Sequence, residues 1–219
     1  MNRRQFITQD DQIDEYYLAL PKTGNGRGVL VLHAWWGLTD VFTAVCDRLA
    51  AAGFVALAPD LYHGQTAATR GQADQLSSTL NGEATYTLLQ RAVVELQAQP
   101  GIEGHPIGVI GFSLGGGWGV ALDRGVAALI IYYATVPLEY VATHAALLGH
   151  FAEHDEFEPL ENVRQYEQAL QSKGLSVDFH VYPNTQHWFA EVNQPGYYDS
   201  AAAELAWQRT IDFLHQQLA

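Results

Sequence analysis

The sequence is poor in cysteine, in basic residues and in long apolar runs. Its one cysteine, Cys46, excludes a disulfide within the chain and fits a reducing compartment, so we expect a cytoplasmic protein. Lys and Arg number 11 against 24 Asp and Glu, and the net charge of -13 argues against nucleic acid, which binds basic surfaces. No apolar run approaches the roughly 18 residues that cross a bilayer. Because residues 1–14 are polar, we expect neither an export signal nor a membrane partner.

The length and the apolar content predict one domain that spans residues 1–219. With 219 residues and 48% hydrophobic residues, the chain can bury a full core. Short apolar runs alternate with helical patterns, which predicts an α/β fold with a mostly parallel sheet and helices on both faces. The pattern leaves monomer and homodimer open. The predicted strands lie at 16–20, 29–33, 54–58, 107–110, 127–132, 146–151 and 177–182, and the predicted helices at 40–52, 82–97, 114–123, 160–173 and 200–218.

The helical patterns also predict caps and buried faces. Asp40 is a suitable N-cap for the first helix, and Cys46 in the same pattern is expected in the core. The predicted inward faces are Val41, Val45, Leu49 and Ala52 in the first helix, Leu88, Leu89, Val93 and Leu96 in helix 82–97, and Leu205, Ile211, Phe213 and Leu214 in the last.

The most informative motif is Gly-Phe-Ser-Leu-Gly-Gly at 111–116. It follows an apolar run and precedes a helical pattern, so Ser113 is expected on a sharp strand-to-helix turn. The flanking glycines fit a turn in which the backbone approaches itself too closely for side chains. Such a turn exposes the serine oxygen, and the N–H groups at the helix start face any negative charge on a substrate. The motif therefore predicts a nucleophile.

A nucleophilic serine needs a base, and the base needs a group that orients it. Four carboxylates follow the predicted strand 146–151, and they are Glu153, Asp155, Glu156 and Glu158. Asp155 is the favoured acid because it is the only aspartate, and its short side chain lies in a loop closed by Pro159. His187, just after the last predicted strand, is the expected base. Because the carboxyl ends of parallel strands share one edge, Ser113, Asp155 and His187 should converge.

The loop at 33–37, which contains two tryptophans, is expected to complete the site. The backbone N–H groups of Trp35 and Leu114 are the predicted oxyanion donors. Trp36 either walls the substrate pocket or packs under the loop. The segment 62–81 either covers the substrate or is a solvated loop with a short helix. Candidates for the substrate pocket are Trp36, Tyr62, Trp188 and Glu191.

Phosphate-binding, dinucleotide-binding and metal-binding patterns fit less well, so we expect no cofactor and no metal. No Lys and Ser/Thr pair follows Gly117, and Ser113 stands where a dinucleotide fingerprint needs glycine. His150 and His154 are spaced by four, but they leave a strand rather than share a helix face. The other histidines are expected to be satisfied or at the surface, and they include His33, His63, His105, His144 and His180.

Together these motifs resemble those of the dienelactone hydrolase family of the α/β-hydrolases. The likeness covers nearly the whole chain. The resemblance implies the α/β-hydrolase fold and assigns the nucleophile, acid and base of the family to Ser113, Asp155 and His187. The matching segments are 33–37, 59–62, 111–116, 187–189, 196–198 and 209–214, with Asp155 in its loop.

Three departures from the family pattern bear on the substrate. Dienelactone hydrolase uses cysteine where this chain has Ser113, and a family glutamate that controls the thiol is replaced by Ala34. The family arginine that binds the substrate carboxylate is replaced by Glu191. A second carboxylate-binding arginine of the family is expected between residues 71 and 90, where this chain has none; Arg70 is the only one nearby. Glu191 would repel an anionic substrate.

The leading hypothesis is a serine hydrolase that cleaves small uncharged carboxylic esters through an acyl-enzyme. One alternative is hydrolysis of dienelactone, the carboxymethylenebutenolidase reaction, or of another lactone on the same machinery. A second alternative is a non-catalytic member that binds a ligand or a partner, because a fold alone does not establish activity.

Overall fold

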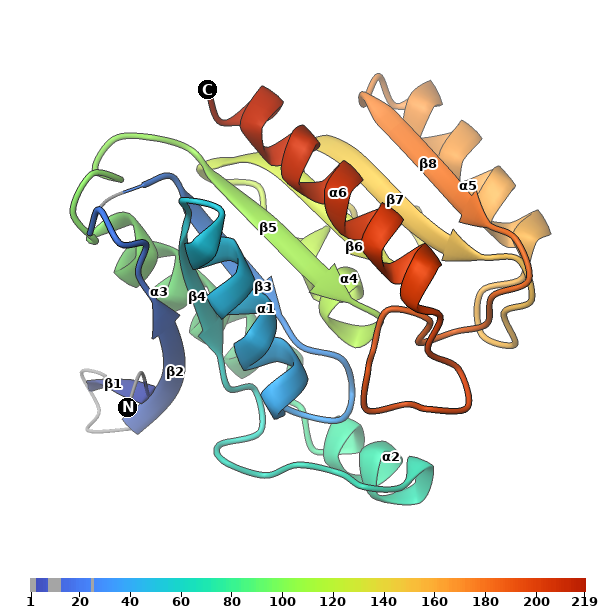
Figure 1. Cartoon of the computed structure of the whole chain (residues 1–219), viewed down its shortest axis with the longest axis horizontal. Helices are drawn as coiled ribbons and strands as arrows, with labels where there is room; N and C mark the ends of the chain where they lie inside the picture. Colours follow the sequence, from blue (N-terminus) through green and yellow to red (C-terminus); the bar gives the residue numbers. More distant parts are fainter. Residues whose placement is uncertain (1–2, 8–12, 25) are drawn as a thin grey trace. The chain divides into compact units, whose positions relative to one another are not determined.

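The computed structural model describes residues 3–7, 13–24 and 26–219. Its contacts divide the chain into two compact units, Met1–Ile107 and Gly108–Ala219 (Figure 1). Each unit contains both strands and helices, and parallel strand pairs occur in both units. The predicted α/β class is confirmed, whereas the single domain spanning 1–219 stays a prediction.

The first unit is built on four strands in the order β1-β2-β4-β3. The strands are β1 (Arg3–Ile7), β2 (Ile13–Ala19), β3 (Gly28–Leu32) and β4 (Val55–Pro59). β1 and β4 pair with β2 in antiparallel fashion, and β3 pairs with β4 in parallel. Every residue of β3 and β4 is buried, which explains their continuous apolar runs. The strand predicted at 16–20 is longer at its start, and β1 had not been predicted.

Three helices belong to this unit: α1 (Asp40–Ala51), α2 (Arg70–Ser78) and α3 (Gly82–Gln97). Figure 1 shows α1 in front of β3 and β4 and α3 behind them. The bounds of α3 match the prediction, and its four predicted inward side chains are buried. α2 shows that the segment 62–81 contains a short helix; a covering role for this segment stays a prediction.

The prediction for α1 was partly wrong. Its N-cap is Thr39 rather than Asp40, which lies in the first turn, where its charge favours the positive end of the helix dipole. Its buried side chains are Phe42, Cys46 and Leu49. The predicted Leu49 is therefore confirmed, whereas Phe42 and Cys46 face the core in place of Val41 and Val45. The core position of Cys46 is confirmed.

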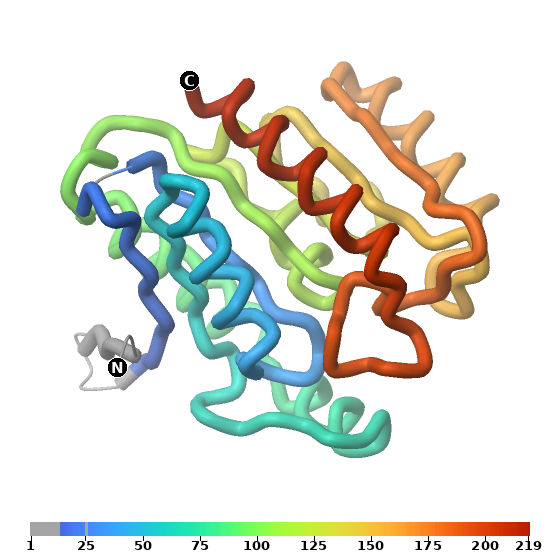
Figure 2. Tube along the Cα trace, viewed as in Figure 1, coloured from blue at the N-terminus to red at the C-terminus, as the bar shows by residue number. Residues whose placement is uncertain are grey.

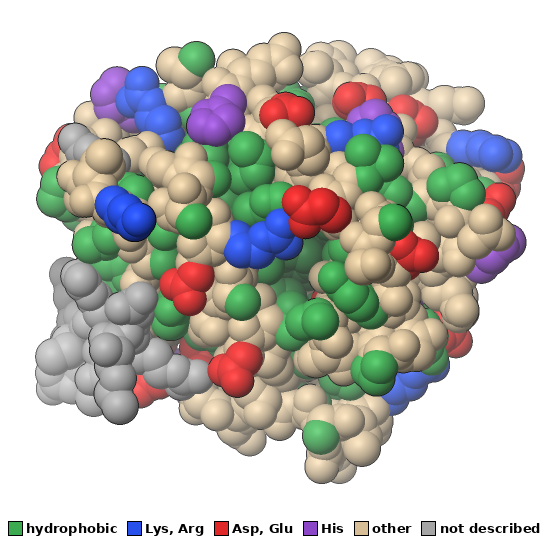
Figure 3. Space-filling view, in the orientation of Figure 1, with side chains coloured by type: hydrophobic (Ala, Val, Ile, Leu, Met, Phe, Trp, Pro, Cys, Tyr) green, Lys and Arg blue, Asp and Glu red, His purple; other side chains and the backbone are tan. Residues whose placement is uncertain are grey.

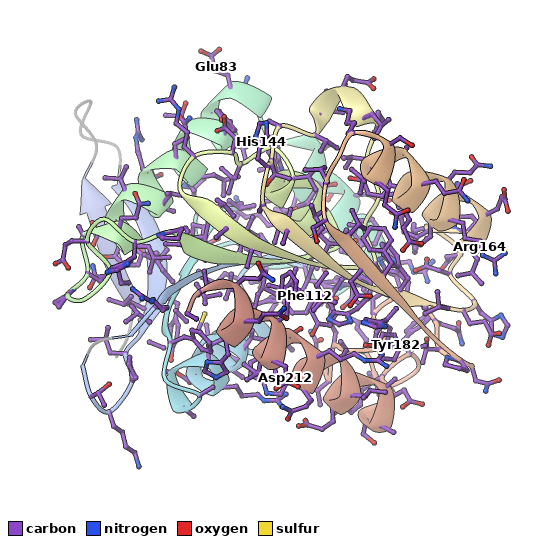
Figure 4. The ribbon with its side chains drawn as sticks, turned by 90° about the horizontal axis from the view of Figure 1, so that it is seen from above. Glu83, Phe112, His144, Arg164, Tyr182 and Asp212 are labelled. Atoms are coloured by element: carbon purple, nitrogen blue, oxygen red, sulfur yellow. The ribbon has the colours of Figure 1, made fainter. Side chains whose placement is uncertain are left out.

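The second unit contains β5 (Ile107–Phe112), β6 (Val126–Tyr132), β7 (Ala146–Ala152) and β8 (Val177–Tyr182), in sequence order across the sheet. β6 pairs with β7 and β7 with β8 in parallel. The helices are α4 (Leu114–Gly119), α5 (Leu160–Ser172) and α6 (Ser200–Gln217), besides a 3-10 turn at Leu138–Tyr140. Figure 4 shows α5, which carries Arg164, and α6, which carries Asp212, on opposite faces of these strands.

Two helix predictions in this unit were wrong in detail. α4 ends at Gly119 rather than at 123, since four of its six residues are glycines, which form helices poorly. In α6 the predicted face is displaced: Leu205 is 48% exposed, and Ile211 and Phe213 are half-buried. The side chains of α6 that are buried are Ala206, Thr210 and Leu214.

Thr210 is buried because it belongs to a polar network around His150. The Nε2 atom of His150 lies 3.0 Å from Thr210 Oγ1, which lies 2.9 Å from the Tyr132 hydroxyl. The Nδ1 atom lies 2.8 Å from the Tyr182 hydroxyl, to which Arg209 donates at 3.1 Å. Tyr182 is labelled in Figure 4, on the α6 side of β8. Because the Tyr182 hydroxyl accepts from Arg209, its own proton suits donation to Nδ1, an arrangement that puts the ring proton of His150 on Nε2, toward Thr210.

Because two histidines are buried, we expect the free energy of unfolding to fall in acid. Burial lowers the pKa of His33 and of His150, and His180 and Arg209 lower the pKa of His150 further. Below about pH 6.5 the unfolded chain protonates both imidazoles before the native chain does, so each destabilises the fold by up to about 1.4 kcal/mol per pH unit on acidification. Burial raises the pKa of Glu158 to about 7, so this carboxyl binds its proton in the native state first and offsets one histidine.

The expected net loss is therefore up to about 1.4 kcal/mol per pH unit between about pH 6 and 5. Urea unfolding followed by circular dichroism at several pH values measures it. His150→Gln should lower by one the number of protons taken up on unfolding, and so bring the slope of the free energy of unfolding against pH near zero. The matched control is His144→Gln, because His144 is exposed (Figure 4). An unchanged slope in His150→Gln would contradict the assignment.

Candidate active site

Ser113 lies on a strained turn between β5 and α4. Its φ and ψ are 49° and -111°, a region that side chains rarely adopt, and strain of this kind clusters at functional sites. A Cβ atom on Gly111 would lie 2.4 Å from the carbonyl oxygen of Gly115, and one on Gly116 would lie 2.7 Å from the Ala134 side chain. Close backbone approach thus requires glycine at 111, as the motif predicts, and the Ala134 side chain leaves no room for a larger residue at 116.

His187 connects Ser113 with Asp155. Its Nε2 atom lies 3.0 Å from Ser113 Oγ, and its Nδ1 atom lies 2.7 Å from Asp155 Oδ2. The other oxygen of Asp155, Oδ1, accepts the backbone N–H groups of Phe157 at 2.8 Å and Glu158 at 3.0 Å. Since Nδ1 donates to the carboxylate, Nε2 is left to accept the serine hydroxyl. The side chains of His187 and Asp155 are 4% and 0% exposed.

The positions of these three residues follow from the ends of the strands. Ser113 follows β5, Asp155 follows β7, and His187 lies in the long connection from β8 to α6 (Figure 2). The structure therefore brings together, within the second unit, the three residues that the order of motifs predicts. The arrangement suits transfer of a proton from a serine hydroxyl to an imidazole.

The other acids near Asp155 have different surroundings. Glu153 accepts the backbone N–H of Asn184 at 2.8 Å. Glu158 accepts the backbone N–H and the hydroxyl of Thr135 at 3.0 and 2.5 Å. Burial, and to a smaller extent the charge of Asp155, raise the pKa of Glu158 to about 7 against the opposing effect of the Thr135 hydrogen bonds. Glu158 is thus a titratable neighbour of Asp155, which sequence reasoning treated only as its competitor.

Aromatic rings enclose His187. The ring centroids of Tyr133, Phe157 and Trp188 lie 4.6, 4.8 and 5.0 Å from that of the imidazole. Sequence reasoning missed Tyr133 and Phe157. The position of Tyr133 directly after β6, at the ends of the same parallel strands, was an available signal. These rings restrict water around the imidazole, which strengthens its electrostatic interactions.

Glu191 contacts one member of this ring cluster, Tyr133. Its side chain is fully buried, and Tyr133 donates a hydrogen bond to Oε1 at 2.8 Å. Burial and the charge of Glu191 raise the pKa of the Tyr133 hydroxyl. Tyr133 also has a φ of 41°, which is unusual for a bulky residue. The predicted pocket roles of Glu191 and Trp188, which is 1% exposed, stay predictions.

In the first unit, His33 fixes the loop that carries Trp35. Its Nδ1 donates to the Ala34 carbonyl at 2.7 Å, and its Nε2 accepts the Leu61 N–H at 3.1 Å. Burial keeps this imidazole neutral by lowering its pKa, as both contacts require. The Trp36 carbonyl accepts the Ala67 N–H at 2.9 Å, so the loop is also tied to the segment after β4. The pairing of the Trp35 and Leu114 N–H groups as oxyanion donors stays a prediction.

Trp36 and Tyr62 are both buried in this unit, at 4% and 2% exposure. The ring centroids of Trp35 and Trp36 lie 5.4 Å apart, with the two indoles edge to face. This contact favours the alternative in which Trp36 packs under the loop rather than the one in which it walls the substrate pocket. The ring of Tyr62 packs at 5.2 Å from that of His33. The predicted pocket roles of Trp36 and Tyr62 stay predictions.

Among the described residues, no three His, Cys, Asp or Glu side chains are grouped as a metal ion needs. Both ring nitrogens of His150 are engaged by Tyr182 and Thr210, so it has none left for a metal shared with His154, which is 65% exposed. His33 is satisfied and His180 is half-buried, while the exposed histidines include His63, His105 and His144.

Two surface properties bear on partners. In the part of the chain that the structure describes, no helix is both long enough and apolar enough to span a membrane. On the face drawn in Figure 3, the Lys and Arg side chains are scattered among polar and apolar ones rather than gathered into a basic patch.

Sequence comparisons give matches along nearly the whole chain. The profile of the dienelactone hydrolase family matches residues 15–218. A putative carboxymethylenebutenolidase of Azospirillum brasilense is 30% identical over 224 residues, which cover 95% of this chain and 96% of that protein. Protein usf of Aquifex pyrophilus is 28% identical over 215 residues, covering 92% of this chain and 93% of its own.

Solved structures share the fold. A putative dienelactone hydrolase from Klebsiella pneumoniae superposes with a TM-score of 0.82 at 22% identity, over 98% of both chains. Esterase 2 of Thermogutta terrifontis, phosphorylated by paraoxon, superposes with a TM-score of 0.73 at 17% identity, over 98% of this chain and 94% of the other. The α/β-hydrolase fold predicted from the motifs is therefore confirmed.

Proposed function

The chain belongs to the dienelactone hydrolase family, and on this premise we propose that it hydrolyses small uncharged carboxylic esters with Ser113, His187 and Asp155 as a catalytic triad. The observation that carries the proposal is the position of His187, within hydrogen-bond distance of both Ser113 Oγ and Asp155 Oδ2. The family and the names of its members support ester or lactone hydrolysis as the reaction class.

In the first half of the reaction, Ser113 Oγ attacks the ester carbonyl carbon while His187 Nε2 takes the hydroxyl proton. Asp155 Oδ2 holds the Nδ1 proton and stabilises the imidazolium that forms. The carbonyl oxygen becomes an oxyanion, to which the backbone N–H group of Leu114, at the start of α4, donates. When the tetrahedral intermediate collapses, His187 returns its proton to the leaving alcohol, and the acyl group stays on Ser113.

In the second half, water replaces the alcohol. His187 Nε2 takes a proton from water, and the hydroxide attacks the acyl carbon. Collapse of the second intermediate releases the carboxylic acid and returns the proton from His187 to Ser113 Oγ. The rings of Tyr133, Phe157 and Trp188 limit competing solvation of the imidazole, so its interaction with Asp155 keeps its strength.

The proposal also covers the partner, the compartment and the oligomeric state of the enzyme. We propose that its only partner is a small-molecule substrate and that it acts in the cytoplasm as a monomer or homodimer. The single cysteine, buried at Cys46, supports a reducing compartment.

The second candidate is dienelactone hydrolysis, which the names of the carboxymethylenebutenolidase relatives favour. We expect instead that kcat/KM for a neutral ester, p-nitrophenyl butyrate, exceeds that for an anionic dienelactone by about tenfold or more, which corresponds to about 1.4 kcal/mol. The physical reason is that Glu191, at the position where the family pattern has an arginine, is buried and bonded to Tyr133, so this position offers no positive charge to a substrate carboxylate. Initial rates with both substrates test the proposal, and preference for the anionic lactone would overturn it.

Glu158 should make the rate depend on pH near neutrality. The ionised carboxylate of Glu158 adds negative charge beside Asp155 and so favours the positive charge that develops on His187. An interaction of about 1 kcal/mol corresponds to about fivefold in rate. Because the pKa of Glu158 is about 7, Glu158→Gln should lower kcat/KM about fivefold above pH 8 and leave it nearly unchanged below pH 6.

Glu161→Gln is the matched control for this pH profile. Glu161 is exposed on α5, and its carboxylate accepts a hydrogen bond from Gln165 in the same helix. Its ratio to the parent enzyme should be flat with pH. A Glu158→Gln deficit of the same size at every pH would indicate loss of structure rather than of charge and would contradict the prediction.

A further inference from the structure

The three aromatic rings around His187 differ in how much of their surface is exposed. Tyr133 and Trp188 are 0% and 1% exposed, so they offer a substrate almost no surface, whereas Phe157 is 42% exposed. A single exposed phenylalanine is ordinary at a protein surface. This one is distinguished by its position, because the same ring packs against the imidazole that the proposed mechanism uses. Of the three rings, Phe157 is therefore the one whose apolar surface is open beside the base.

The reacting nitrogen of His187 lies close to this ring. The centroids of Phe157 and the imidazole lie 4.8 Å apart, and imidazole atoms lie about 1.2 Å from their own centroid, so Nε2 lies within about 6 Å of the Phe157 centroid. In the proposed mechanism, Nε2 returns its proton to the leaving alcohol, whose oxygen therefore stands about 3 Å from it. A four-carbon chain that begins at this oxygen spans about 5 Å and is long enough to reach the phenyl ring.

Phe157 is held in place by its neighbours. Its backbone N–H donates to Asp155 Oδ1 at 2.8 Å, and its ring centroid lies 5.4 Å from that of Trp188. Trp188 in turn meets Tyr197 edge to face at 5.0 Å, and its φ of 69° is one that a bulky residue rarely adopts. A side chain that is already ordered loses little conformational entropy when a substrate packs against it, so more of the contact free energy remains for binding.

An exposed apolar ring at this place favours an apolar group on the substrate. When an alkyl chain packs against a phenyl ring, apolar surface of both leaves water, which stabilises the complex. We propose that Phe157 contacts the alcohol part of the ester, so that the enzyme selects esters of alcohols with several carbons over methyl esters. This inference rests on the proposed function and specifies the alcohol part of its substrate.

Three neutral esters separate the alcohol side from the acyl side. Butyl acetate and methyl pentanoate are isomers that differ in which side carries the butyl group, and methyl acetate is the reference for both. Because the two acetates form the same acetyl-enzyme, their ratio of kcat/KM reports the step in which the alcohol leaves. In pH-stat assays we expect this ratio, butyl over methyl, to be about tenfold in the parent and to fall about fivefold in Phe157→Ala. The ratio of methyl pentanoate to methyl acetate should change by less than about twofold.

Two further variants distinguish this contact from general damage to the loop. Phe157→Leu keeps much of the apolar surface and should keep most of the butyl acetate preference. Leu205→Ala, the matched control, removes a side chain that is 48% exposed on α6 and should leave both ratios unchanged.

The outcomes separate a failure of this inference from a failure of the proposed function. A butyl acetate ratio near one in the parent, or one that is unchanged in Phe157→Ala, would show that the ring does not contact the alcohol. A fall in the methyl pentanoate ratio at least as large as that for butyl acetate would place the acyl group there instead. Each of these results overturns the inference and leaves the ester hydrolase standing. If the parent hydrolysed none of the three esters, the proposed function would fail and the inference with it.

Discussion

Ser113→Ala should lower kcat/KM for p-nitrophenyl butyrate by about four to six orders of magnitude. The variant removes the atom that His187 Nε2 approaches at 3.0 Å, so no acyl-enzyme can form. The loss should be in kcat/KM and in the burst of p-nitrophenol, while the far-UV circular dichroism stays that of the parent. Loss of less than about tenfold would show that Ser113 is not the nucleophile.

The thiol of Cys46 is the natural competitor, because the family pattern includes a cysteine nucleophile. Cys46 is fully buried in α1, and burial raises the pKa of its thiol, so the reactive thiolate is suppressed. Cys46→Ala is therefore the control and should keep activity. A fluorophosphonate probe should label Ser113 in the parent and in Cys46→Ala, but not in Ser113→Ala. A label found on Cys46 would contradict the assignment of Ser113 as the nucleophile. So would the disappearance of the label in Cys46→Ala.

The parts of the fold that could be predicted are those governed by local signals. α3 was predicted with its observed bounds because it carries a long apolar stripe, and the structure adds that the Asn81 side chain caps the helix by accepting the Ala84 N–H at 3.0 Å. The turn at Ser113 was predicted because close backbone approach requires glycine at fixed positions. The convergence of the three residues followed from a general property of parallel sheets, in which the strand ends that carry Ser113, Asp155 and His187 share an edge.

The parts that could not be predicted depend on partners far away in the sequence. The face of α6 was misplaced because Thr210 looks like a surface residue until His150 and Tyr132, 60 and 78 residues away, give it hydrogen bonds. Glu158 looked like one of four interchangeable acids. Its contact with Thr135, 23 residues earlier, distinguishes it from the others, and its burial, which the sequence does not reveal, raises its pKa.

Asp155→Asn should lower kcat/KM by about 10⁴-fold, because the structure dictates which way the amide faces. Oδ1 of Asp155 accepts two backbone N–H groups, from Phe157 and Glu158. An asparagine keeps its carbonyl oxygen there, since the NH₂ group would clash with both donors. Its NH₂ group then takes the place of Oδ2, 2.7 Å from His187 Nδ1. Nδ1 must accept, so the ring proton moves to Nε2, where it blocks transfer of the Ser113 proton.

The tautomer gives a second measurement besides the rate. In ¹⁵N NMR spectra, neutral His187 should carry its proton on Nδ1 in the parent and on Nε2 in Asp155→Asn. The control is Asp155→Ala, which removes the orienting group without imposing the wrong tautomer, so it should be no less active than Asp155→Asn. If Asp155→Asn kept the parent tautomer or lost less than about tenfold in rate, the carboxylate would not orient His187, and another acid in the loop would have to do so.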